Sequence, residues 1–152
     1  MQNMRHKKLA AMLLTLVMAL SLLTVTAFAE EITVTDAEGL KGAIADGKTI
    51  ILGANIDNVN IEIPEDVIVT LNLNGHTLTG AAGIQDVISN KGYLTLEGDG
   101  KVTALKGGAV VNYPGAIASI EGGEYNAETW YTIKNLGAYV KHVHITDFTA
   151  PG

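Results

Sequence analysis

Two glutamates and a histidine occur at nearly equal spacing in the second half of the chain. Asn74, Glu97, Glu121 and His144 follow one another at sequence intervals of 23, 24 and 23. If the backbone repeats its course at that interval, the two carboxylates lie about 5 Å apart on neighbouring strands. Carboxylates at that distance can share a cation, and two carboxylates near that spacing also serve retaining glycosidases. An exposed polar face is the simpler interpretation, and a calcium or other cation site at Glu97, Glu121 and His144 is the alternative.

Two adjacent aromatic residues, Trp130 and Tyr131, follow Ala127-Glu128-Thr129 in a segment without a strand pattern. An exposed indole beside a phenol ring forms a platform for the apolar face of a sugar ring. The alternative is that one of the two rings fills the interior, since adjacent residues of a strand point in opposite directions. We therefore predict Trp130 and Tyr131 as a glycan-binding pair, with that alternative left open.

A second group of metal-binding side chains comes near the end of the chain. His142 and His144 are two residues apart, and Glu121 is a conceivable third ligand for a transition metal. Two histidines without further ligands are more simply interpreted as an exposed pair on the surface than as a metal site. The sequence therefore predicts no definite metal site and, apart from the calcium considered above, no cofactor.

A sequence repeat with a period in the low twenties positions these side chains. Four-residue segments with an apolar or aromatic second residue begin at Thr77, Lys101, Glu124 and Asp147, at intervals of 24, 23 and 23. An asparagine two places after an apolar residue recurs at nearly the same interval, at Asn90, Asn112 and Asn135. A fixed period of this length is typical of a solenoid, in which each unit buries its apolar face against the next.

The local pattern within each unit favours strands. Residues 69–74 read VTLNLN, in which apolar and polar residues alternate, and glycines interrupt the short runs. Leucine-rich repeats share the period but need a denser leucine pattern and often a helix in each unit. We therefore predict a parallel β-helix with an inward column of Leu73, Leu96, Ile120 and Val143. The repeated asparagines are predicted to form a hydrogen-bonded ladder along the axis.

Three segments carry a resemblance to a known superfamily. They are VTLNLNGHTL at 69–78, the apolar-x-Asn-x-Gly of 88–92 and 133–137, and EGGEY at 121–125. In these segments the chain resembles the right-handed parallel β-helix superfamily that includes pectate lyases, in particular the form with short coils found in bacterial surface proteins. The resemblance implies an all-β, right-handed parallel β-helix, which we expect to have about five short coils. It does not select a function, because this scaffold carries lyases, hydrolases, adhesins and binding proteins.

One segment near the start has a helical pattern. Thr35 or Asp36 can cap a helix over about residues 37–45, and Leu40, Ala43 and Ile44 share one face. In the resembled superfamily such a helix closes the N-terminal end of the coil. The alternative is an incidental helix in a leader segment.

Residues 1–29 have the pattern of a secretory signal peptide. A basic start is followed by an apolar run, and Ala27-Phe28-Ala29 precedes the acidic Glu30-Glu31. A retained transmembrane anchor is the alternative. The chain has no cysteine, so an oxidising exterior forms no disulfides in it. We therefore predict a secreted or cell-surface protein with a β-helix domain at 30–152, truncated at its C-terminal end.

The charge of the predicted mature chain limits its partners. Beyond residue 29 it holds seven lysines, no arginine and all 16 acidic residues, a net charge of −9. Nucleic acid is disfavoured as a partner, because phosphate recognition needs the opposite charge and arginine forks. An acidic polysaccharide is disfavoured too, unless a bound cation mediates the contact.

The catalytic patterns of the resembled superfamily do not match this chain. Its lyases use an arginine base and clustered aspartates for calcium, whereas its polygalacturonase-like hydrolases need an aspartate doublet and Gly-His-Gly. In this chain residues 74–77 read NGHT, and the acidic doublet at 65–66 follows a proline.

We therefore predict a non-catalytic surface module, structural, adhesive or glycan-binding. The alternative is the N-terminal fragment of a polysaccharide lyase or glycoside hydrolase whose catalytic coils follow Gly152. An open edge on the last coil predicts end-to-end self-association.

Overall fold

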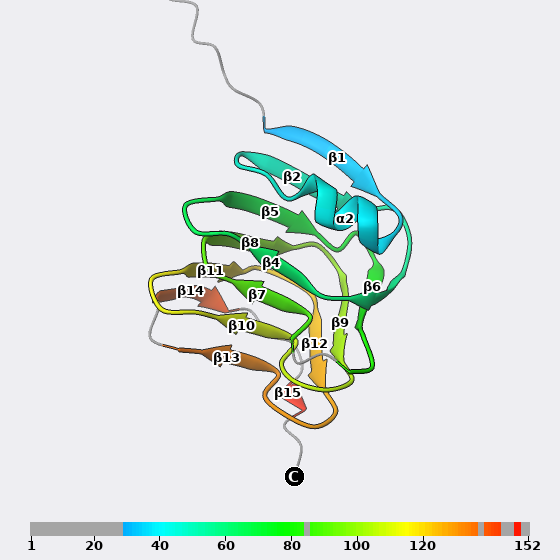
Figure 1. Ribbon diagram of the computed structural model, residues 1–152, viewed down its shortest axis with the longest axis vertical. Helices are drawn as coiled ribbons and strands as arrows, with labels where there is room; N and C mark the ends of the chain where they lie inside the picture. Colours follow the sequence, from blue (N-terminus) through cyan, green and yellow to red (C-terminus); the bar gives the residue numbers. More distant parts are fainter. Residues whose placement is uncertain (1–28, 84–85, 137–138, 144–147, 150–152) are drawn as a thin grey trace, which may run out of the picture.

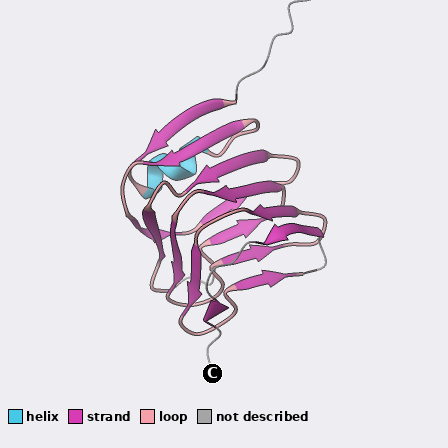
Figure 2. Cartoon of the chain, turned by 180° about the vertical axis from the view of Figure 1, so that it is seen from behind, coloured by secondary structure: helices cyan, strands magenta, loops and turns pink. Residues whose placement is uncertain are grey.

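The computed structural model describes residues 29–83, 86–136, 139–143 and 148–149. Their strands form three sheets of parallel strands that run along one axis, as Figure 1 shows from the front and Figure 2 from behind. The predicted signal segment lies almost entirely outside the described residues. No helix within the described ranges is long and apolar enough to cross a membrane.

In each sheet, neighbouring strands come from successive passes of the chain. Sheet A contains β1 (Glu30–Val34), β2 (Lys48–Leu52), β5 (Ile68–Asn72), β8 (Tyr93–Glu97), β11 (Ile117–Ile120) and β14 (Tyr139–Val143). Sheet B contains β15 (Phe148–Thr149), β12 (Glu124–Ala127), β9 (Gly100–Ala104), β6 (His76–Gly80) and β3 (Ile56–Val59). Sheet C contains β13 (Ile133–Asn135), β10 (Val110–Asn112), β7 (Ile88–Asn90) and β4 (Ile61–Ile63).

The chain visits the sheets in the order A, B, C and then returns to A one strand further along. The triplets β2–β4, β5–β7, β8–β10 and β11–β13 therefore make about four turns of a parallel β-solenoid. This confirms the predicted fold class, but the prediction of about five coils was slightly too high. The fifth coil is represented only by β14 and β15, so the described residues do not complete it.

Apolar side chains from each turn stack inside the solenoid. Leu96 pairs in register with Ile120, which in turn pairs with Val143, as predicted. The next member of this column is Leu71 and not Leu73, because the turn that leads from β5 to β8 is longer than the period assumed from the sequence. A shift of two residues keeps the same face inward, so Leu73 is buried too, at the corner between sheets A and B.

The predicted asparagine ladder is confirmed. Asn112 pairs in register with Asn90 on one side and Asn135 on the other. The amide of Asn90 donates to Oδ1 of Asn112 over 2.6 Å, and the amide of Asn112 donates to Oδ1 of Asn135 over 3.3 Å. Asn90 and Asn112 are fully buried, where an amide without partners would cost stability. The ladder therefore fixes how successive turns align.

The helix α2 (Ala37–Ala43) covers the N-terminal end of the solenoid (Figure 1). Asp36 is its N-cap, and the side chain accepts a hydrogen bond from the backbone N–H of Gly39 over 2.7 Å. Leu40 and Ala43 are buried against the strands of the first turn. The cap and the inward face match the prediction, although the helix ends two residues earlier than expected.

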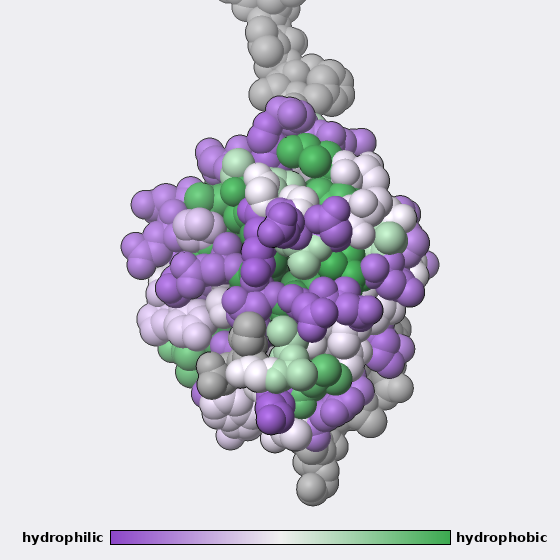
Figure 3. All heavy atoms as spheres, turned by 45° about the vertical axis from the view of Figure 1, so that its right-hand side comes forward, coloured by the Kyte–Doolittle hydropathy of each residue, from purple (hydrophilic) through white to green (hydrophobic). Residues whose placement is uncertain are grey.

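Outward-facing residues alternate with these inward-facing residues along each strand. Figure 3 shows mostly polar side chains on one face of the molecule, with smaller apolar patches between them. Thr95, next to Leu96 on β8, is partly exposed, whereas Leu96 has no exposed surface. Inward and outward positions therefore follow the period of two expected for strands.

We expect Leu96→Ala to lower the free energy of unfolding by about 2–5 kcal/mol, because it leaves a cavity in the middle of the column. Thr95→Ala is the matched control and should change it by less than about 0.5 kcal/mol. Thermal unfolding followed by circular dichroism measures both. Similar losses at the two positions would contradict the assignment of inward and outward faces.

We expect Asn112→Ala to destabilise the protein by about 1–3 kcal/mol, because it leaves the buried amide of Asn90 without its ladder partner and breaks the link to Asn135. Asn126→Ala, at a half-buried outward position on β12, should have little effect. Urea unfolding compares the two variants, and a harmless Asn112→Ala would show that the ladder does not stabilise the solenoid.

Candidate functional site

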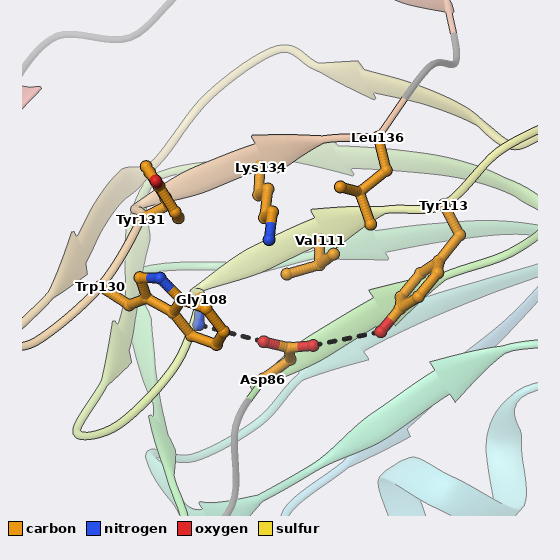
Figure 4. Close-up of a pocket in the computed structure, with 8 residues that line it drawn as sticks. All are labelled: Asp86, Gly108, Val111, Tyr113, Trp130, Tyr131, Lys134 and Leu136. Carbon is orange, nitrogen blue, oxygen red and sulfur yellow. Dashed lines mark hydrogen bonds between the residues drawn. The ribbon is translucent and has the colours of Figure 1, made fainter.

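A hollow of about 210 Å³ lies on the outer side of sheet C, where it meets the loops coming from sheet B (Figure 4). The residues around it come from three successive turns. They are Asp86, Gly108, Val111, Tyr113, Trp130, Tyr131, Lys134 and Leu136.

The asparagine ladder brings these residues together. Asp86, Gly108 and Tyr131 each lie four residues before a ladder asparagine, so the solenoid stacks them in one column. Val111 and Lys134 pair in register on neighbouring strands. Each comes directly before a ladder asparagine, so its side chain points to the outer side of the sheet. The hollow is therefore built by the same register that aligns the core.

Asp86 is held at one side of the hollow by two hydrogen bonds. Its Oδ1 accepts from the backbone N–H of Gly108 over 3.1 Å, and its Oδ2 accepts from the hydroxyl of Tyr113 over 3.4 Å (Figure 4). Each donor comes from the next turn of the solenoid. The carboxylate is thus fixed in orientation, and each of its oxygens keeps a lone pair for a further donor.

Gly108 creates the space. A Cβ atom at this position would lie 2.7 Å from Cγ2 of Val111, 3.3 Å from the carbonyl oxygen of Tyr131 and 3.5 Å from Oδ1 of Asp86. A larger residue would therefore push into the floor of the hollow and crowd the carboxylate.

Trp130 and Tyr131 line the end of the hollow away from Tyr113 (Figure 4). The ring centroids of Trp130 and Tyr131 are 6.1 Å apart, with 33° between the ring planes. The two residues are 45% and 56% exposed, so neither ring fills the interior. This removes the alternative in which one of them is a core residue. Their role in glycan binding stays a prediction.

Lys134 lies over both rings. Its Nζ is 4.9 Å from the ring centroid of Trp130 and 5.4 Å from that of Tyr131. Ammonium groups are attracted to aromatic faces at these distances, most strongly to tryptophan. The hollow therefore joins an acidic group, a basic group and two exposed rings.

The predicted cation site lies elsewhere, at the C-terminal ends of the strands of sheet A. Glu97 accepts a hydrogen bond from the amide of Asn72 over 3.0 Å, and Glu121 accepts one from the hydroxyl of Ser119 over 3.1 Å. Asn72, and not Asn74, stands in register with Glu97, for the same reason that Leu71 replaces Leu73. The third predicted ligand, His144, lies outside the described residues. Within the described ranges, no three His, Asp or Glu side chains are grouped so as to hold a metal ion.

A second hollow, of about 290 Å³, lies at the corner between sheets C and A. It is lined by Glu65, Asp66, Lys91, Tyr93, Pro114 and Gly115. The Nζ of Lys91 forms an ion pair with Oε2 of Glu62 over 2.8 Å. The hydrogen bond within this pair raises the pKa of Lys91. With one aromatic ring in its lining, this hollow offers less to a sugar than the first.

Several residues of the first hollow escaped the sequence analysis. Asp86, Gly108 and Val111 belong to no motif, and Lys134 and Leu136 occupy only the variable positions of the apolar-x-Asn-x-Gly motif at 133–137. The signal that could have found them was present, because counting back four residues from each ladder asparagine gives Asp86, Gly108 and Tyr131. Comparison of the chain with protein-family models, curated proteins and solved structures gave no match. The geometry of this hollow is therefore the basis on which a function can be inferred.

We expect Gly108→Ala to cost about 1–3 kcal/mol of stability, because the new methyl group overpacks the floor against Val111. Gly42→Ala is the control, since an added Cβ there meets nothing within 4 Å. It lies in helix α2 and should stabilise the protein by up to about 1 kcal/mol. Urea unfolding of both variants measures the difference. Equal effects would mean that Gly108 is not tightly packed.

Proposed function

We propose that this protein is a secreted, non-catalytic β-solenoid of the pectate-lyase-like kind that binds glycans through the hollow over sheet C. The observation that carries the proposal is the exposed pair Trp130 and Tyr131 beside the fixed carboxylate of Asp86.

The chemistry of a sugar matches this combination. A pyranose ring has an apolar C–H face, which packs on aromatic rings, and an edge of hydroxyl groups, which need donors and acceptors. Trp130 and Tyr131 offer the first surface. Asp86 accepts hydrogen bonds from the hydroxyl groups of the edge.

The size of the hollow fits one sugar unit of a longer chain. Its volume of about 210 Å³ is below the range of about 300–1,000 Å³ typical for small-molecule pockets. A glycan would therefore place one residue here while its neighbours continue over the outer surface of the solenoid.

Binding is favoured over hydrolysis. Glycoside hydrolysis by the usual routes uses two carboxylates flanking the bond. Among the described residues that line the hollow, only Asp86 carries one. Secretion is supported by the signal-like residues 1–29 and by the acidic, cysteine-free remainder of the chain.

Trp130 is the only tryptophan of the chain, so its fluorescence reports on the site directly. We expect the emission to shift as soluble oligosaccharides are titrated. Tyr131→Ala should weaken binding about 2- to 12-fold, which corresponds to about 0.5–1.5 kcal/mol for one aromatic contact. Tyr93→Ala removes an exposed ring on sheet A and should leave binding unchanged. An emission spectrum that stays constant across neutral, basic and acidic glycans would contradict the proposal.

A further inference from the structure

The position over the two rings is already taken by a cation. Lys134 comes from β13, and its amine points into the hollow (Figure 4). Of the ion pairs between described residues, none includes Lys134. Its ammonium group is thus held by the faces of Trp130 and Tyr131, at 4.9 and 5.4 Å from their centroids.

This arrangement affects which sugars can bind. A neutral sugar that packs on the same ring faces must displace the ammonium group and lose its attraction to them. That attraction is worth about 2- to 30-fold in binding, depending on how far the site is desolvated. A ligand with its own ammonium group replaces this interaction instead of losing it.

The surrounding charge favours the same kind of ligand. The carboxylate of Asp86 faces the hollow, and both of its hydrogen-bond donors, Gly108 and Tyr113, are uncharged. The chain beyond residue 29 has a net charge of −9, which attracts cations and repels anions at long range. An anionic sugar could pair with Lys134 but would meet Asp86 and the field of the whole protein.

We infer that the hollow recognises amino sugars, with a protonated sugar amine taking the place of the Lys134 ammonium group over Trp130 and Tyr131. Lys134 has a flexible stem and is partly exposed, so it can turn toward solvent when the ligand enters. It acts as a built-in competitor that sets the affinity. This inference rests on the proposed glycan-binding function and narrows it to one class of sugar.

Isothermal titration of the whole chain with glucosamine oligomers and with their fully N-acetylated counterparts tests the selectivity. We expect the free-amine oligomers to bind at least about tenfold more tightly where the amine is protonated. The preference should disappear when the pH is raised until the sugar amine is neutral. Oligogalacturonates serve as the anionic comparison and should bind most weakly.

Lys134→Met tests the competitor role, since it keeps an unbranched apolar stem and removes the ammonium group. We expect it to bind glucosamine oligomers about 2- to 30-fold more tightly than the original chain. Lys134→Arg keeps the cation and should not bind them more tightly. Lys41→Met, an exposed change of the same charge on α2, controls for net charge.

The outcomes separate the two proposals. Equal binding of free and acetylated oligomers would overturn the amine inference and leave glycan binding standing. Preference for oligogalacturonates would also overturn it, because Lys134 would then be an anion receptor. Binding of no oligomer at all would overturn the proposed function itself. The comparison of ligands on the unaltered chain does not depend on the folding of any variant.

Discussion

The register between successive turns is the constraint on which the rest of this structure depends. Parallel strands hydrogen-bond only when each turn lies directly on the one before, and the ladder of Asn90, Asn112 and Asn135 fixes that alignment from inside. A buried amide has few ways to satisfy its donors and acceptors, so a slip of the register would leave several unpaired. The apolar column of Leu71, Leu96 and Ile120 then fills the space beside it.

The hollow on sheet C follows from the same register. Residues from three turns meet there because equivalent positions of a solenoid become neighbours in space. Three different residues in one column, Asp86, Gly108 and Tyr131, produce a carboxylate, a gap and a ring in direct succession. A repeat scaffold thus obtains a composite site by varying outward residues, while the inward residues keep the fold.

The site combines groups that limit each other. Asp86 is oriented by Gly108 and Tyr113, whereas Lys134 is held by two rings instead of a carboxylate. Under the proposed glycan binding, a ligand must therefore offer something that these internal contacts do not already provide. In the inferred recognition of amino sugars, Lys134 is the side chain that sets the selectivity.

The sequence by itself determined the solenoid, because period markers such as Asn112 recur wherever the same inward environment recurs. It also determined the capping helix, since Asp36 and the spacing of Leu40 and Ala43 are local signals. The exact register needed the tertiary structure: the turns differ in length, so equal spacing placed Leu73 where Leu71 lies. The exposure of both Trp130 and Tyr131 was likewise decided only in three dimensions, because a loop does not obey the alternation of a strand. Asp86 and Lys134 form a site only through stacking, which brings together residues that share no local motif.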